Sequence, residues 1–97
     1  MAAIRYAPRA LADMERLCDF LAVSDPVLAD RTIDLIVSAA AVLEQHPLIG
    51  RPAESGLREL VISRGRSGYL ALYRYDEHRD RGLVLSIRHQ REAGYVG

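Results

Sequence analysis

Eight side chains in the second half of the chain are of types that can hold and cleave RNA. Two of them, His89 and Tyr95, can move protons, and the other six are arginines, which bind phosphate. Cleavage of RNA by its own 2′-hydroxyl needs a base, an acid and a cation that stabilises the charge developing on the phosphate. The alternative interpretation, which the pattern favours, is that the arginines face solvent or pair with an acidic segment of another protein. The arginines are Arg58, Arg64, Arg66, Arg74, Arg88 and Arg91.

The charge of the chain is balanced overall but unevenly distributed. Thirteen basic and thirteen acidic residues give a formal net charge of zero, so no general attraction to nucleic acid or membrane is predicted. Residues 1–49 carry four arginines and seven acidic residues, a net charge of −3, whereas residues 50–97 carry nine arginines and six acidic residues, a net charge of +3. All basic residues are arginine, whose planar fork binds phosphate or carboxylate through two hydrogen bonds. The basic half is therefore the half that contains the candidate site.

Motifs for cofactors and metals are missing from the sequence. It has no glycine-rich phosphate loop, paired-cysteine ligand set or nucleophile elbow, so no cofactor is predicted. The three histidines, His46, His78 and His89, are scattered over different elements, whereas zinc needs three or four convergent ligands. Cys18 is the only cysteine, and its helical spacing predicts a place in the core. Neither a metal site nor a disulfide is predicted.

Length and hydropathy indicate one globular domain in the cytoplasm. Ninety-seven residues, 49% hydrophobic and 27% charged, are enough to build a single core, so we expect one domain over residues 1–97. No apolar run approaches the roughly 20 residues that span a bilayer. The first six residues also lack the layout of a signal peptide.

The first half of the chain has the periodicity of two amphipathic helices. After an extended segment at residues 3–6, apolar residues recur every three or four positions over residues 8–23. Ser24–Pro26 supplies a helix cap followed by proline, so a second helix begins with almost no loop, and its spacing continues until His46–Pro47. The two helices are predicted to form a hairpin. Its apolar positions are Leu11, Met14, Leu17 or Cys18, Leu21, Ala29, Ile33, Ile36, Ala40 and Leu43.

Beyond a turn-rich connector at residues 47–56, the apolar period changes to two, which predicts strands. The predicted strands are residues 57–63, 68–75 and 83–89. Because the links between them are short, we expect an antiparallel meander. The predicted fold class is α+β, with the order β-α-α-β-β-β and the helical hairpin packed on one face of the antiparallel sheet.

Five short motifs in this order resemble the RelE/ParE superfamily of toxins over nearly the whole chain. They are Gly50-Arg51-Pro52, Leu57-Arg58-Glu59-Leu60, Gly68-Tyr69 followed by Tyr73-Arg74, Ile87-Arg88-His89, and Arg91-Glu92. The resemblance implies a small cytoplasmic toxin that is neutralised by a cognate antitoxin, whose C-terminal segment wraps it. It also implies an operon that the complex represses, so that DNA is contacted only through the antitoxin.

The superfamily divides by target, and this sequence departs from one branch. RelE-like members cleave messenger RNA in the ribosome with two basic residues on the strand before the Gly-Tyr pair and an arginine after that tyrosine. Here these positions are Val61, Ser63 and Leu70. The resemblance therefore favours the ParE-like branch, whose members bind DNA gyrase. A ribosome-dependent endoribonuclease is the alternative, and a non-toxic binding protein is the third hypothesis.

The resemblance also divides the candidate residues into two roles. His89 falls where an arginine or histidine acts in nuclease members, and Tyr95 matches their C-terminal tyrosine. With Arg74, these two would be the catalytic residues of a nuclease. The residues expected to bind the target or the antitoxin are Arg58, Arg64, Arg66, Arg88 and Arg91. We also expect the hairpin or the apolar sheet face to bind an amphipathic antitoxin helix.

Overall fold

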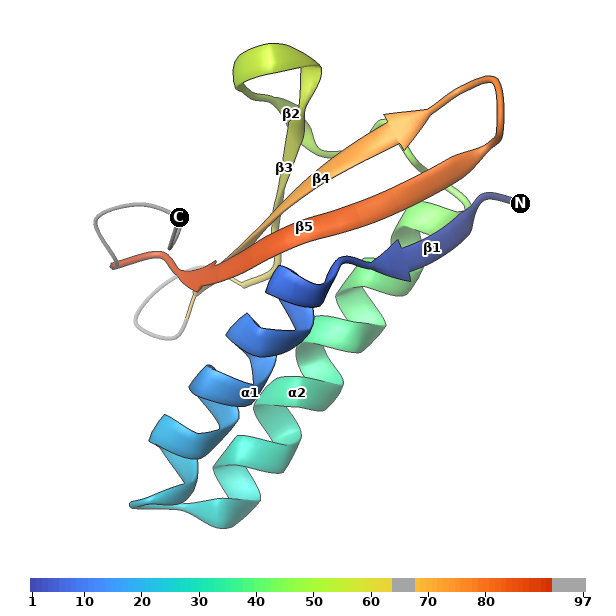
Figure 1. Cartoon of the computed structure of the whole chain (residues 1–97). Coiled ribbons are helices and arrows are strands. Elements are labelled where there is room, and N and C mark those ends of the chain that lie inside the picture. Colours follow the sequence, from blue (N-terminus) through green and yellow to red (C-terminus); the bar gives the residue numbers. More distant parts are fainter. Residues whose placement is uncertain (64–67, 92–97) are drawn as a thin grey trace.

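The chain folds into a helical hairpin packed against one face of a five-stranded sheet (Figure 1). The computed structural model describes residues 1–63 and 68–91. The elements within these ranges are β1 (Ala3–Tyr6), α1 (Pro8–Ala22), α2 (Pro26–Ala41), the 3₁₀ turn η1 (Val42–Glu44), β2 (Arg51–Pro52), the 3₁₀ turn η2 (Glu54–Gly56), β3 (Arg58–Val61), β4 (Tyr69–Asp76) and β5 (Arg81–His89). The predicted α+β class, its order of elements and the antiparallel meander are confirmed.

The sheet has the strand order β1-β5-β4-β3-β2. Strand β1 runs parallel to β5, with Ala3 opposite Arg81 and Tyr6 opposite Val84, whereas the other neighbours are antiparallel. Periodicity predicts the first strand but does not identify this partner. The two-residue strand β2 lies inside the predicted connector, where Pro52 and neighbouring glycine indicate a turn. A register shift between Leu72 and Tyr73 marks a β-bulge in the β4–β5 ladder.

The helix ends follow from local sequence. Helix α1 begins at Pro8, and the Asp25 carboxylate caps α2 by accepting the Leu28 N–H at 3.1 Å. The predicted continuation of the second helix to residue 46 is wrong, because α2 ends at Ala41 and the chain tightens into η1 before Pro47. In the part of the chain that the structure describes, no helix is long and apolar enough to cross a membrane.

The buried face of α1 agrees with the predicted stripe at Met14 and Leu17 but not at Leu11. Leu11, a predicted core position, is 52% exposed, while Ala10 is fully buried. Ala10, Asp13, Met14 and Leu17 follow the i, i+3, i+4, i+7 pattern of a single helix face. Ala10 therefore takes the core place predicted for Leu11, which lies about 100° further around the helix, and Asp13 joins the buried face.

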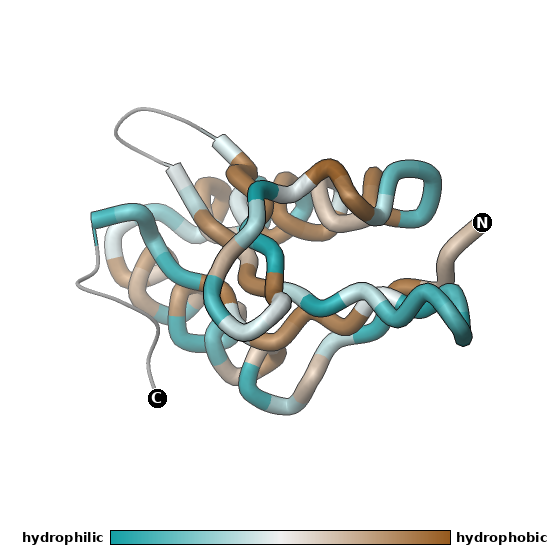
Figure 2. Tube along the Cα trace, turned by 90° about the horizontal axis from the view of Figure 1, so that it is seen from above, coloured by the Kyte–Doolittle hydropathy of each residue, from teal (hydrophilic) through white to brown (hydrophobic). Residues whose placement is uncertain are grey.

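The core lies between the two helices and the sheet face that packs on them. The turn from β4 to β5 lies outside this core and is hydrophilic (Figure 2). The inner face is the sheet face that packs on α1 and α2. Ile36, Leu43, Tyr73, Val84 and Ile87 are the largest fully buried side chains. Cys18 is half-buried rather than central.

A hydrogen-bonded staple fixes the connector to the middle of the sheet. The Tyr73 hydroxyl donates to the Pro47 carbonyl at 2.7 Å and accepts the Gly50 N–H at 2.9 Å. Arg58 adds bonds from Nη1 to the carbonyls of Gly50 at 2.8 Å and Leu48 at 3.2 Å. A Cβ atom on Gly50 would lie 2.5 Å from Tyr73 Cε1, so only glycine fits beneath this ring.

Candidate functional site

The candidate site lies at the end of the β4–β5 ladder, where Tyr69 pairs with His89 and Leu70 pairs with Arg88. Successive side chains of a strand point to opposite faces. Tyr69 and His89 therefore share the inner face, whereas Leu70 and Arg88 share the outer face, which is turned away from the helices. Val61 of β3 pairs with Leu70 and extends the outer set.

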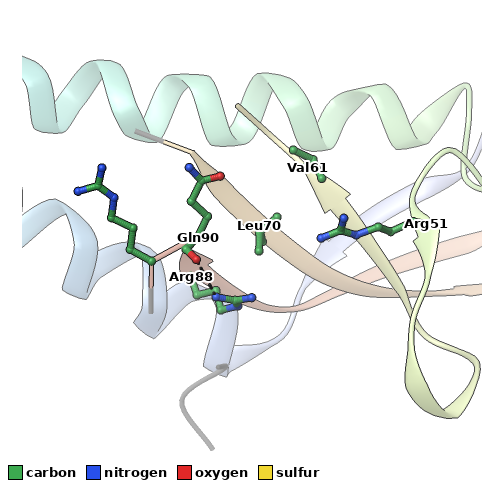
Figure 3. Close-up of a pocket in the computed structure, with 6 residues that line it drawn as sticks. Arg51, Val61, Leu70, Arg88 and Gln90 are labelled. Carbon is green, nitrogen blue, oxygen red and sulfur yellow. Dashed lines mark hydrogen bonds between the residues drawn. The ribbon is translucent and has the colours of Figure 1, made fainter. Parts of the chain in front are cut away.

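The outer face carries a pocket of about 660 Å³, here called the outer-face pocket. Figure 3 shows the aliphatic side chains of Val61 and Leu70 between the arginine side chains of Arg51 and Arg88. The Nη1 atom of Arg88 contacts the carbonyls of His89 and Gln90, both at 3.4 Å. The pocket is lined by Arg51, Val61, Leu70, Arg88, Gln90 and Arg91.

The inner face carries a second cavity of about 680 Å³ between α1 and the end of the sheet, here called the inner-face cleft. Phe20 stands at the cleft and is 77% exposed. The Tyr69 and His89 rings meet edge to face, with centroids 5.2 Å apart and planes at 85°. The cleft is lined by Arg16, Leu17, Phe20, Leu21, Tyr69, His89 and Arg91. It offers an apolar side chain a place beside cationic groups.

The hydrogen bonding of His89 limits the proton chemistry of its ring. Its Nδ1 atom accepts the backbone N–H of Arg91 at 3.1 Å. A neutral ring that accepts at Nδ1 carries its proton on Nε2, which can then donate but cannot accept a proton. Burial raises the pKa of Tyr69, and a hydrogen bond with Thr32 partly offsets this. The backbone N–H of Arg91 thus orients the His89 ring, and Tyr69 holds its hydroxyl proton to a higher pH than a free tyrosine.

A buried carboxylate that the sequence analysis did not single out fixes α1 to this strand end. Asp13 is 3% exposed and accepts hydrogen bonds from Ser86 Oγ at 2.7 Å and from the Ile87 N–H at 2.8 Å. Arg16 Nη2 lies 3.8 Å from the other carboxylate oxygen. The signal for Asp13 is its spacing, since it lies three residues after Ala10 and four before Leu17 on one helix face.

The structure brings together only part of the predicted site. Arg88, His89 and Arg91 lie at one strand end, but Arg88 and His89 face opposite sides of the sheet. Arg58 lies on the inner face and holds the connector. Arg74 is exposed and pairs with Leu83, five positions along β4 from Tyr69, which is roughly 17 Å at the usual rise per residue.

Three predicted site residues, Arg64, Arg66 and Tyr95, lie outside the described residues. Sequence reasoning missed Arg51, which lines the outer-face pocket and pairs with Glu59. The Gly-Arg-Pro motif was its signal. Within residues 1–63 and 68–91, no group of three or more His, Cys, Asp or Glu side chains is placed to hold a metal ion.

The helical hairpin on a mainly antiparallel sheet is similar to chains in two solved toxin-antitoxin systems. The chain is similar to a chain in the structure of the chromosomal ParDE system from P. aeruginosa, with a TM-score of 0.77, 26% identity, and coverage of 92% of this chain and 96% of that one. It has the fold of a chain in the RelBE2 complex from Mycobacterium tuberculosis, with a TM-score of 0.65, 23% identity, and coverage of 92% and 98%.

Sequence comparison identifies the family. Residues 4–94 match the family described as the ParE toxin of the type II toxin-antitoxin system parDE. Toxin RelE3 of Caulobacter vibrioides is 39% identical over 92 residues, which cover 95% of this chain and 98% of that protein. Toxin RelE2 of the same organism is 37% identical over 62 residues, or 64% and 70% of the two chains. The chain belongs to the ParE toxin family and is a type II toxin of the RelE/ParE superfamily.

Proposed function

We propose that this toxin stops growth by binding DNA gyrase through protein contacts and that it does not cut RNA. The observation that carries the proposal is the outer face at Val61 and Leu70. These two residues pair across β3 and β4 as aliphatic neighbours, where RNA-cleaving relatives are expected to carry cations. The arginines that line the same pocket, Arg51, Arg88 and Arg91, come from other positions. The two strand sites from which the relatives would stabilise the phosphorane charge therefore carry hydrocarbon here, and charge stabilisation is usually the largest catalytic term.

The placement of the proton-transfer candidates also supports this proposal. His89 lies in the inner-face cleft, whereas Arg88 lines the outer-face pocket. Arg74 lies five positions away along β4. Acid, base and cation must be held within about 1 Å of productive geometry for efficient reaction. Groups on opposite faces of one sheet do not meet this condition.

The test is a supercoiling assay with purified gyrase, run beside a ribosome-bound messenger RNA cleavage assay. We expect supercoiling to be inhibited and the RNA to stay intact. Induction of the toxin without an antitoxin should then reduce incorporation of label into new DNA before incorporation into new protein. Unaffected supercoiling at micromolar excess of toxin would overturn the proposal, and normal growth under strong induction would identify a non-toxic binding protein.

The alternative is a ribosome-dependent endoribonuclease with His89, Tyr95 and Arg74 as its catalytic residues. Its specific support is the 39% identical relative, which is named RelE3. In this case the double variant His89→Ala, Tyr95→Phe loses toxicity and RNA cleavage together, whereas the gyrase proposal expects toxicity to remain. His78→Ala is the matched control, because His78 lies in the exposed turn between β4 and β5.

We further propose that the toxin is a single cytoplasmic domain neutralised by an antitoxin whose C-terminal segment wraps it. The inner-face cleft supports this assignment, because the exposed Phe20 and the half-buried Leu21 line it together with the buried Leu17 and offer an apolar contact to an amphipathic helix. Phe20 is the natural anchor, since an exposed aromatic ring beside a cavity contributes large contact area at low entropic cost.

A further inference from the structure

The outer-face pocket has the chemistry of a site for a carboxylate beside an aliphatic side chain. Three of its lining residues are the arginines Arg51, Arg88 and Arg91, and none of its described lining residues is acidic. Val61 and Leu70 lie between Arg51 and Arg88 and form an aliphatic floor (Figure 3). A ligand that fills this pocket therefore needs one anionic group and one apolar group at neighbouring positions.

The lining favours a peptide over a nucleic acid. Proteins hold unpaired bases by stacking them on aromatic rings or arginine planes. Here the floor is aliphatic and the described lining contains no aromatic side chain, so the arginine planes are the only stacking groups that this lining offers. Glu59 also binds Arg51 at the rim, through a 2.9 Å bond to Nε, and adds a negative charge there. A single carboxylate can approach Arg88 and Arg91 and avoid Glu59, whereas a phosphate backbone brings a charge with every nucleotide.

We propose that the outer-face pocket binds an antitoxin segment in which an acidic residue adjoins an aliphatic residue. This inference rests on the proposed neutralisation by an antitoxin and assigns that partner a second contact, on the sheet face opposite the inner-face cleft. The carboxylate lies between Arg88 and Arg91, and the aliphatic side chain packs on Val61 and Leu70. Arg88 is the main anchor, because contacts with two backbone carbonyls hold its guanidinium in place before the ligand arrives.

The experiment measures the Kd of the purified cognate antitoxin for toxin variants over a series of salt concentrations. Arg88→Gln removes the anchor charge and keeps a polar side chain. We expect its Kd to rise about 10- to 100-fold, as charge-assisted hydrogen bonds at interfaces usually give. The salt dependence of binding should also become shallower, because one ion pair is lost.

Two further variants keep the test independent of folding. Val61→Thr changes only the apolar character of the floor, and Arg91→Gln changes an exposed side chain, so both should raise the Kd by a smaller factor. Because Arg91 also lines the inner-face cleft, Val61→Thr is the variant that reports on the outer-face pocket alone. Arg79→Gln is the charge-matched control. Its side chain is 73% exposed in the β4–β5 turn, outside the pocket, and we expect an unchanged Kd.

The outcomes separate this inference from the proposed function. Replacement of one antitoxin glutamate or aspartate by arginine should restore binding to an Arg88→Glu toxin, and this result identifies the bound residue. Unchanged Kd values for Arg88→Gln and Val61→Thr would overturn the inference while antitoxin binding stands, because these two residues line the outer-face pocket and not the inner-face cleft. Loss of gyrase inhibition or of binding to a labelled single-stranded RNA, with the antitoxin Kd unchanged, would assign the pocket to a target and also overturn it. Failure of the unaltered toxin to bind any antitoxin would overturn the proposed neutralisation itself.

Discussion

The two buried tyrosines of β4, Tyr73 and Tyr69, lie on the same face but at two different kinds of place. Tyr73 is fully buried, and its hydroxyl is bonded to both Pro47 and Gly50. Tyr69 is 4% exposed, but its ring edge meets His89 beside the inner-face cleft. The part of β4 around Tyr73, here called the closed end, is where hydrogen bonds fix the fold. The strand end at Tyr69, here called the open end, is where side chains are available to a partner.

The largest loss of stability is expected at the closed end, around Tyr73. In Gly50→Ala the new Cβ would lie 2.5 Å from Tyr73 Cε1, 2.7 Å from its hydroxyl and 3.0 Å from the Glu59 carbonyl. We expect a loss of about 2–4 kcal/mol in the free energy of unfolding, because the ring must move and the staple must break. Urea unfolding followed by circular dichroism measures this loss.

Gly82→Ala is the control for that experiment. A Cβ atom there meets only the flexible end of the Ile4 side chain, at 2.7 Å. The end of this side chain can move aside, so we expect a clearly smaller loss in the free energy of unfolding. Equal losses for the two variants would mean that the staple around Gly50 contributes nothing special to the closed end.

The next largest effect is expected where α1 holds the open end. Asp13→Ala leaves the Ser86 hydroxyl and the Ile87 N–H without their buried acceptor. The expected loss is about 1–3 kcal/mol, the usual cost of buried polar groups left unsatisfied. Since α1 also lines the inner-face cleft, the affinity for the antitoxin should fall as well.

Asp19→Ala is the matched variant for Asp13. It removes the same charge from the same helix at an exposed position. Its unfolding free energy should stay within about 0.5 kcal/mol of the unaltered protein. If both variants lose equal stability, the effect belongs to helix charge and not to the bond between α1 and β5.

A third prediction separates binding from stability at the inner-face cleft. Phe20 is 77% exposed, so Phe20→Ser should change the unfolding free energy by no more than about 0.5 kcal/mol. If Phe20 is the anchor of an amphipathic helix, the same change should weaken antitoxin binding by at least 10-fold. Val23→Ser is the control, because Val23 is 89% exposed but does not line the cleft. Isothermal titration calorimetry measures the antitoxin affinity of both variants. Equal affinities of Phe20→Ser and Val23→Ser would mean that Phe20 is not in the interface.

Much of the fold was predictable because its signals are local. The Asp25 cap, proline at the start of each helix, and the two-residue alternation of β4 all act within a few residues. The parallel pairing of β1 with β5 was not predictable in this way, since it joins segments about 78 residues apart in the register. Asp13 shows the same limit, because its partners lie 73 and 74 residues along the chain.

The site was harder to predict, although one rule was available. Arg88 and His89 are adjacent on a predicted strand, and adjacent strand residues face opposite sides. Their separation into two pockets follows from that alternation. The role of Arg58 in holding the connector could not be predicted from the alternation. Its acceptor carbonyls belong to a turn, and hydrophobic periodicity does not predict the path of a turn.

The smallest expected effect concerns a third tyrosine of β4, which lies next to neither pocket. The Tyr75 hydroxyl donates to Asp80 Oδ1 at 2.6 Å, and this bond together with nearby acidic residues raises the pKa of Tyr75 to about 12. Because the folded pKa is above the ordinary value of 10, the bond contributes fully below pH 10 and is lost as the pH rises towards 12. Burial also raises the pKa values of Tyr6, Tyr69 and Tyr73, so several tyrosines should titrate above pH 10. Absorbance at 295 nm should show this late titration, and Tyr75→Phe should remove the part of it near pH 12. The antitoxin affinity of Tyr75→Phe at neutral pH should equal that of the unaltered toxin, because the β4–β5 turn lies at neither the closed end nor the open end of β4. A changed affinity would mean that the partner contacts more of the sheet than the strand end.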